Sequence, residues 1–174
     1  MNFDDIVKNR YSVRAYQEKV VEKELINQIL ESGRLAPTAG CENPVIVYNL
    51  NEEQIHRLKE ATKYTFDAKN IFLICYDSNI SFKRKQDGLD FGMQDVSIVT
   101  THMMLKITEI GLGSCWVGSF HPDRVSQIFN LENNIVPAAI LPFGYISENS
   151  RPSEWHYDRR PMNEFVKEID KKGE

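Results

Sequence analysis

Apolar and polar positions follow two different spacings along the chain, one typical of helices and one typical of strands. Where apolar residues recur every three or four positions, a helix can bury one face. The predicted helices cover residues 2–9, 22–35, 51–58, 95–110 and a short stretch after residue 122. Continuous apolar and β-branched runs predict strands over residues 45–50, 71–76, 114–120 and 135–145. Helices that alternate with strands in this way indicate α/β layering.

Polar signals mark helix starts and connections. Asn2 can cap the first helix, and Asn51 followed by Gln54 is a capping-box arrangement for the third. The helix over residues 95–110 is apolar nearly all round, so it lies either in the core or in a subunit interface. Residues 77–92 are polar, include "KRK" and predict a loop that covers either a site or only solvent. The tail to Glu174 is arginine-rich and then helical.

Composition limits the classes of function. At 174 residues the chain is long enough to bury a real core, so we expect a single domain over residues 1–174. The 21 basic residues against 25 acidic ones give a net charge of −4, without the basic excess of a general nucleic-acid binder. Any anion site must therefore be local.

The first ten residues and the cysteines indicate the compartment. The start, "MNFDDIVKNR", has two acids and no apolar core, so it is neither a secretory signal nor a transit peptide. No apolar run approaches the roughly 18 residues of a membrane span, and we expect a cytoplasmic protein with no membrane partner. Cys41, Cys75 and Cys115 form no CxxC or Cys/His spacing, so neither a disulfide framework nor a metal site is indicated.

The stretch "NRYSVRAY" carries the first candidate chemistry. In an extended segment, residues two apart share a face, so Arg10, Ser12 and Arg14 converge while Val13 turns away. Two guanidinium groups and a hydroxyl on one face make a receptor for a phosphate or another planar anion. The alternative is a solvated strand edge protected by its charges.

Two further stretches contain prolines or glycines, which restrict or widen the range of backbone conformations. "LAPTAGCENP" leaves main-chain amides pointing outward, and is either a ligand-binding loop or a simple connection. In "GLGSCWVGSF", Gly118 inside a strand marks the close approach of another backbone or a flat ligand, unless it is only a bulge after a helix cap. His121 and His156 belong to no recognisable triad and are expected to be structural or exposed. The chain lacks GxGxxG, GxxxxGK[ST] and HExxH, which disfavours the nucleotide folds with glycine-rich loops.

These stretches, in this order, resemble the FMN-dependent nitroreductase family over nearly the whole chain. The matching motifs are "NRYSVRAY", similar to an Arg-Arg-Ser-x-Arg opening, then "APTAGCENP", "GLGSCWVGSF", "PFGY" and the terminal "RRPMNEF". The resemblance implies an α+β fold: a three-layer α/β/α sandwich with a mixed, mainly antiparallel central sheet. It also implies an intertwined homodimer with flavin at the interface, which the long apolar helix through Met103, Met104 and Leu105 would fit.

The resemblance further implies roles for individual residues. Arg10, Ser12 and Arg159 would hold the FMN phosphate, and Arg14 would reach the pyrimidine edge of the flavin, where a cation favours the reduced state. Residues 37–39 would come from the second subunit, and the amides at 118–119 would face N5 and O4. The expected cofactor-binding residues are Arg10, Tyr11, Ser12, Arg14, Pro37, Thr38, Ala39, Cys41, Trp116, Val117, Gly118, Ser119 and Arg159.

The chain also departs from the family pattern. Tyr11 stands where the opening motif has its second arginine, and the alternation of side chains predicts that this position points away from the anion site. Cys41 stands where the family usually has Asn, and Asn43 where it usually has Gln. Those amides contact the flavin edge or the substrate, so the substitutions bear on cofactor affinity and on the choice of acceptor.

The implied function is an FMN-dependent NAD(P)H oxidoreductase that reduces small electron-poor acceptors such as nitroaromatics or quinones. NAD(P)H would deliver hydride to flavin N5 and leave, and the acceptor would then take the electrons, so no catalytic side chain is required. One alternative is a flavin-binding or redox-sensing protein with little turnover. The other is a relative that removes halogen or fragments flavin.

Overall fold

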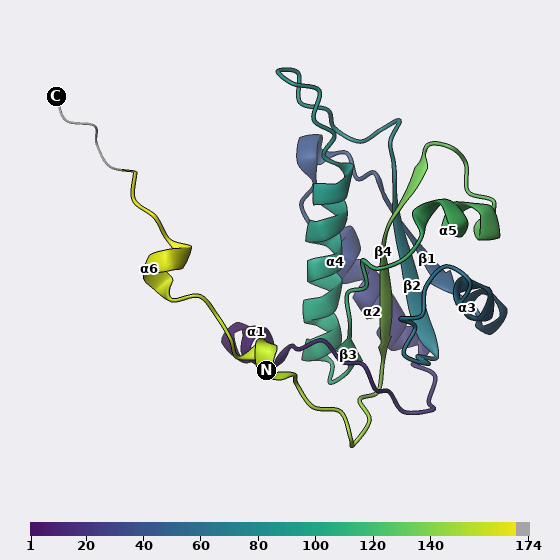
Figure 1. Ribbon diagram of the computed structural model, residues 1–174, viewed down its shortest axis with the longest axis vertical. Coiled ribbons are helices and arrows are strands. Elements are labelled where there is room, and N and C mark those ends of the chain that lie inside the picture. Colours follow the sequence, from purple (N-terminus) through teal and green to yellow (C-terminus); the bar gives the residue numbers. More distant parts are fainter. Residues whose placement is uncertain (170–174) are drawn as a thin grey trace.

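A four-stranded antiparallel sheet forms the centre of the structure, a computed structural model that describes residues 1–169 (Figure 1). The strands are β1 (Val45–Leu50), β2 (Asn70–Asp77), β3 (Gly113–Ser114) and β4 (Ile135–Gly144), in the order β1-β2-β4-β3. One isolated parallel bridge, between Ser12 and Ser114, makes the sheet mixed. The predicted sheet type is confirmed.

Helices cover both faces of this sheet. They are α1 (Phe3–Asn9), α2 (Lys23–Arg34), α3 (Glu52–Leu58), α4 (Gly92–Glu109), α5 (Pro122–Phe129) and α6 (Met162–Phe165), with 3-10 turns at Ala39–Cys41 and Glu154–His156. In Figure 1, α2 and α4 lie on one face, and α3 and α5 on the other. The three-layer α/β/α sandwich implied by the resemblance is therefore confirmed. Within residues 1–169, no helix has the length and apolar character to cross a membrane.

The two predicted helix caps are confirmed, whereas α4 begins at Gly92 rather than at the predicted residue 95. Asn2 and Asn51 each cap a helix in a complete capping box. Along β2, Phe72 and Ile74 pack toward α2 and α4, whereas the alternate residues pack toward α3 and α5. Phe72 stacks on Phe143 with ring centroids 4.4 Å apart, which joins β2 to β4 in the first of these two cores.

The long helix α4 buries two of the three residues named for the expected interface. Met103 and Met104 are 0% and 8% exposed and pack in the core of their own chain, whereas Leu105 is only partly buried. The reason is the close approach of α2, since a Cβ on Gly33 would lie 2.9 Å from the Met103 Cγ atom. The apolar side chains that α4 does expose are Met93 and Ile98.

The predicted strand over residues 114–120 is confirmed only in part, because β3 itself ends at Ser114. Beyond it, the chain stays paired with β4 as far as Val117: the amides of Cys115 and Val117 donate to the carbonyl oxygens of Pro142 and Ile140 at 3.1 and 2.9 Å, and the Val117 carbonyl accepts from the Ile140 amide at 3.1 Å. The chain then leaves the sheet, since the carbonyl of Ser119 accepts from Thr62 Oγ1 at 2.8 Å instead. This departure exposes Gly118 and Ser119.

Residues 77–92 form a projecting arm. The arm is closed by a bridge between Lys83 and Asp90, and by edge-on packing of Phe82 against Phe91. It projects from the N-terminal end of α4 (Figure 1). The predicted helix of the tail is present as the single turn α6, and its last residues, 170–174, lie outside the described residues.

The N-terminal segment is fixed across the end of β3. The amide of Val13 donates to the Ser114 carbonyl at 3.0 Å, and the Tyr16 hydroxyl lies within hydrogen-bond distance of the carbonyl oxygens of Val13 and Pro142, at 2.7 and 3.1 Å. Val13 is almost completely buried against Gly113. These contacts hold the residues on either side of Val13 at the surface.

Gly113→Ala is expected to lower the free energy of unfolding by about 1–3 kcal/mol, because it overpacks this contact. The new Cβ would lie 2.5 Å from the Val13 Cγ2 atom and 2.8 Å from a side-chain carbon of Ile146. Urea unfolding measures the change, with Gly118→Ala as the matched control. A Cβ on Gly118 would meet nothing closer than 4.0 Å, so equal losses in both variants would contradict the packing explanation.

Candidate functional site

Residues from the two ends of the described chain line one pocket of about 220 Å³. Arg10, Ser12 and Arg14 come from the segment after α1, and Arg159 comes from the tail. In Figure 1 the tail returns from β4 to lie beside α1. The pocket therefore exists only because segments about 150 residues apart meet, which no local sequence pattern can express.

The backbone after α1 explains the convergence. α1 ends at Asn9, and Arg10 has extended dihedral angles of −63° and 121°. Val13 is buried beneath, while Arg14 on its outer side is exposed. Arg10, Ser12 and Arg14 all line the same pocket, as predicted.

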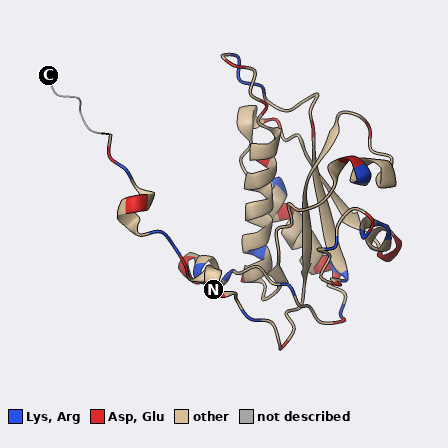
Figure 2. Cartoon of the chain, in the orientation of Figure 1, with Lys and Arg blue, Asp and Glu red and all other residues tan. Residues whose placement is uncertain are grey.

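The pocket is strongly cationic and lacks a counterion. Within residues 1–169, none of Arg10, Arg14 and Arg159 forms an ion pair with a carboxylate. Burial and the like charge of Arg159 lower the pKa of Arg10 below its usual value. Figure 2 shows acidic and basic residues interspersed over the rest of the chain, so this concentration of positive charge is local. Three guanidinium groups and a hydroxyl suit a phosphate dianion.

Tyr11 does not point away from the pocket as predicted. Its side chain lines the wall, its hydroxyl donates to Ser150 Oγ at 3.1 Å, and its ring meets His156 edge-on at 6.2 Å between centroids. The prediction fails because this stretch forms two isolated bridges, Ser12 with Ser114 and Tyr16 with Ile146, and no continuous strand, so the strict alternation of a strand does not hold. Tyr11 instead joins the N-terminal segment to the tail.

Beside this pocket lie two small polar side chains that the sequence did not single out. The hydroxyl of Ser114 is buried and has no hydrogen-bond partner among the described residues. The thiol of Cys115 is also buried, and burial raises its pKa, against the opposing effects of Arg14, Ser12 and Arg10. Cys115 thus stays a protonated thiol next to the arginines.

Gly118 and Ser119 line a different, wider pocket of about 580 Å³, together with residues 59–64 and His121. A Cβ at Gly118 would meet only Trp116 Nε1, at 4.0 Å, so its main chain is open to a flat ligand. The side chains of Trp116 and Val117 pack into the two cores on opposite faces of the sheet. The exposed feature of this segment is therefore its backbone.

The loop at residues 37–41 lies away from both pockets. Gly40 and Cys41 have positive φ angles of 68° and 62°, and Cys41 is exposed. The loop follows α2 and is tied to the N-terminal turn of α4, whereas Gly113 and the N-terminal segment lie at the other end of α4 (Figure 1). The 18 residues of α4 span about 27 Å. Pro37, Thr38, Ala39 and Cys41 therefore do not join Arg10 within one chain.

Asp95 holds this loop and was missed from sequence. One carboxylate oxygen accepts from the Ala39 amide at 2.8 Å, while the other is buried without a partner in the described structure. The available signal was an acid in the first turn of a largely apolar helix. Also missed were the pocket residues Ser153 and Trp155, for which the nearby Arg159 was the signal, while His156, expected to be structural or exposed, lines the pocket as well. His121 is exposed at the N-cap of α5, as predicted.

A family model and curated relatives match this chain. The model of the "Nitroreductase family" matches residues 7–71 and 65–145. A protein from Methanothermobacter thermautotrophicus, named "Putative NADH dehydrogenase/NAD(P)H nitroreductase", is 31% identical over 157 residues. The aligned region covers 86% of this chain and 80% of that relative.

Solved structures share the architecture. The crystal structure of a nitroreductase family protein from Clostridium difficile 630 is 40% identical and superimposes with a TM-score of 0.90, over 96% of this chain and 98% of that chain. A nitroreductase-fold protein from Desulfovibrio desulfuricans, solved in complex with FMN, is 22% identical with a TM-score of 0.82 over 98% of both chains. The second likeness shows the fold alone.

Proposed function

Because the chain belongs to the nitroreductase family, a family of oxidoreductases, we propose that it is an FMN-dependent NAD(P)H oxidoreductase acting on small electron-poor acceptors. The observation that carries this proposal is the pocket where Arg10, Ser12 and Arg159 meet without a carboxylate partner. A flavoprotein from Desulfovibrio desulfuricans with the same fold binds FMN, and the relative from Methanothermobacter is named for NAD(P)H. Nitroaromatics and quinones are the proposed acceptors.

The arginine pocket fits the phosphate end of FMN. Arg10 and Arg159 repel each other in the free protein, and a phosphate between them would remove that repulsion. Ser12 adds a neutral donor that needs no counterion. Charge-assisted hydrogen bonds of this kind are roughly twice as strong as neutral ones. The phosphate would thus anchor the cofactor, and the rest of the chain would orient it.

Arg14, Gly118 and Ser119 are assigned to the flavin ring. Arg14, at the exposed rim of the same pocket, would place a fixed cation beside the pyrimidine edge, and the open backbone at Gly118 and Ser119 would offer amide donors. Bound FMN would supply the hydride acceptance and donation at N5. The protein needs no acid or base of its own, because its task is to bind, to orient and to stabilise developing charge.

We also propose that the site is shared between two copies of the chain in a homodimer. The loop at residues 37–41 and the arginine pocket lie at opposite ends of α4, so one chain cannot supply both to one flavin. The tail runs away from the body of its own chain (Figure 1). Its exposed apolar side chains are Trp155, Tyr157, Met162, Phe165, Val166 and Ile169. Such side chains on an extended arm are typical of a segment that packs on a partner.

The experiment is a titration of the apoprotein with FMN, combined with light scattering. The proposal predicts a mass of twice the 20.2 kDa of one chain, and one bound FMN per chain. A mass of 20.2 kDa with FMN fully bound would contradict the shared site. FMN that fails to bind at all would contradict the proposed function itself.

A further inference from the structure

The wide pocket beside Gly118 is lined by residues 118–121 and by residues 59–64, after α3. The proposed flavin site uses the backbone at Gly118 and Ser119, but not the wall formed by residues 59–64. Thr62 Oγ1 donates to the Ser119 carbonyl at 2.8 Å, and the His121 amide donates to the Ala61 carbonyl at 3.0 Å. These bonds fix the wall relative to the open backbone at Gly118.

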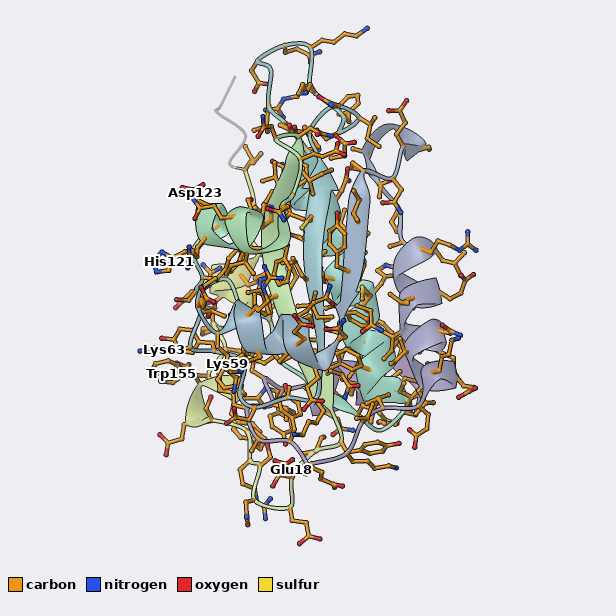
Figure 3. The ribbon with its side chains drawn as sticks, turned by 90° about the vertical axis from the view of Figure 1, so that its right-hand side faces the viewer. Glu18, Lys59, Lys63, His121, Asp123 and Trp155 are labelled. Atoms are coloured by element: carbon orange, nitrogen blue, oxygen red, sulfur yellow. The ribbon has the colours of Figure 1, made fainter. Side chains whose placement is uncertain are left out.

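Of the charged side chains at residues 59–64, Lys59 and Glu60 form ion pairs within the described part of the chain and Lys63 does not. Lys59 forms an ion pair with Asp67 at 2.8 Å, and the carboxylate of Glu60 is paired with Arg124 at 2.5 Å. Lys63 has no carboxylate partner within residues 1–169, and its ammonium nitrogen lies 5.3 Å from the centroid of the Tyr64 ring. Figure 3 shows Lys59, Lys63 and His121 on the same side of the molecule, with Lys63 at its outer edge.

We propose that this pocket binds the phosphate groups of the nicotinamide dinucleotide, and that Lys63 is their main contact. The inference rests on the proposed function, because it gives the reductant a place beside the flavin ring. A dinucleotide carries its negative charges away from the nicotinamide ring, so a ring placed near Gly118 would extend its phosphates along this wall. The volume of about 580 Å³ lies within the roughly 300–1,000 Å³ of small-molecule sites.

Lys63 would also favour binding of the dinucleotide reductant over binding of the electron acceptor. Nitroaromatic and quinone acceptors carry no phosphate, so they gain nothing from a cation on the rim of the pocket. The reductant gains a charge-assisted hydrogen bond and attraction over a longer range. Substitution of Lys63 should therefore change the binding of the reductant and leave the KM of an uncharged acceptor unaltered.

The test measures binding of NADP⁺ and NAD⁺ to the FMN-loaded protein by calorimetry, so that it does not depend on turnover. Lys63→Ala is expected to weaken NADP⁺ binding roughly tenfold, since hydrogen bonds to charged groups are among the stronger ones. Lys63→Arg should restore most of the affinity, because it keeps the charge. Lys85→Ala, on the exposed arm before α4, is the matched control and should change nothing.

Each outcome decides the proposal. Weaker binding of NADP⁺ alone assigns Lys63 to the 2′-phosphate, and equal weakening for NAD⁺ assigns it to the pyrophosphate; both support the pocket. Unchanged affinity in Lys63→Ala, or no binding of either dinucleotide to the unaltered protein, overturns it. If binding depends on Lys63 but neither NADH nor NADPH reduces the flavin, the pocket stands and the proposed function fails.

Discussion

Arg10→Ala is expected to weaken FMN binding by roughly ten- to a hundredfold, through loss of charge-assisted hydrogen bonds to the phosphate. The structure adds a second expectation, for the protein without FMN. Burial and Arg159 disfavour the charged Arg10 side chain, so its removal should leave the unfolding free energy of the apoprotein unchanged or higher. A variant that loses cofactor but not stability would identify Arg10 as a binding residue.

Fluorescence of released FMN measures the dissociation constant, and urea unfolding measures the stability. Arg34→Ala is the control, because Arg34 is an exposed arginine paired with Glu31 on α2. Arg159→Ala should resemble Arg10→Ala, and the double variant should lose less than the sum, since the two residues would share one phosphate. Unchanged FMN retention in Arg10→Ala would remove this residue from the site.

Co-expression of two defective chains should restore FMN binding if the site is shared. Thr38→Glu puts a carboxylate on the loop assigned to the partner's flavin, and Arg10→Ala removes a phosphate contact. Each variant alone should bind FMN poorly. In a mixed dimer, one site carries both substitutions and the other carries neither. With free assortment, about a quarter of all sites should therefore bind FMN normally.

The experiment distinguishes a shared site from a site built within one chain, because the latter predicts no recovery of FMN binding. Each mixed dimer would then contain two sites with one defect each, and binding would stay as low as in the separate variants. Purification through different tags on the two chains isolates the mixed species. Recovery to about one FMN per mixed dimer would support the shared site, and absence of recovery would contradict it.

Local chemistry made much of the fold predictable. The caps at Asn2 and Asn51 and the buried run of β2 depend on residues a few positions apart, and the structure confirms them. The surroundings of α4 were not predictable, because apolar residues all round do not distinguish a core from an interface. The close contact of Met103 with Gly33 places that side chain in the core of its own chain.

The candidate site, too, was predictable only where its residues lie close together in the sequence. Arg10, Ser12 and Arg14 lie within five residues of one another, so their pattern alone indicated an anion site. The contacts of Tyr11 with Ser150, of Asp95 with Ala39 and of Thr62 with Ser119 each join distant segments. Such pairings arise from tertiary packing, and neither partner carries a local signal for the other. Lys63 could be noticed only once its neighbours were known to be paired.

The most direct test of the central claim is an anaerobic visible spectrum of the FMN-loaded protein, recorded before and after addition of NADH and then NADPH. The proposed function predicts a flavin absorption band that bleaches on addition of at least one nucleotide and returns when a quinone or nitroaromatic acceptor is added. A band that persists with both nucleotides would contradict an NAD(P)H oxidoreductase, and would favour a flavin-binding or redox-sensing protein instead.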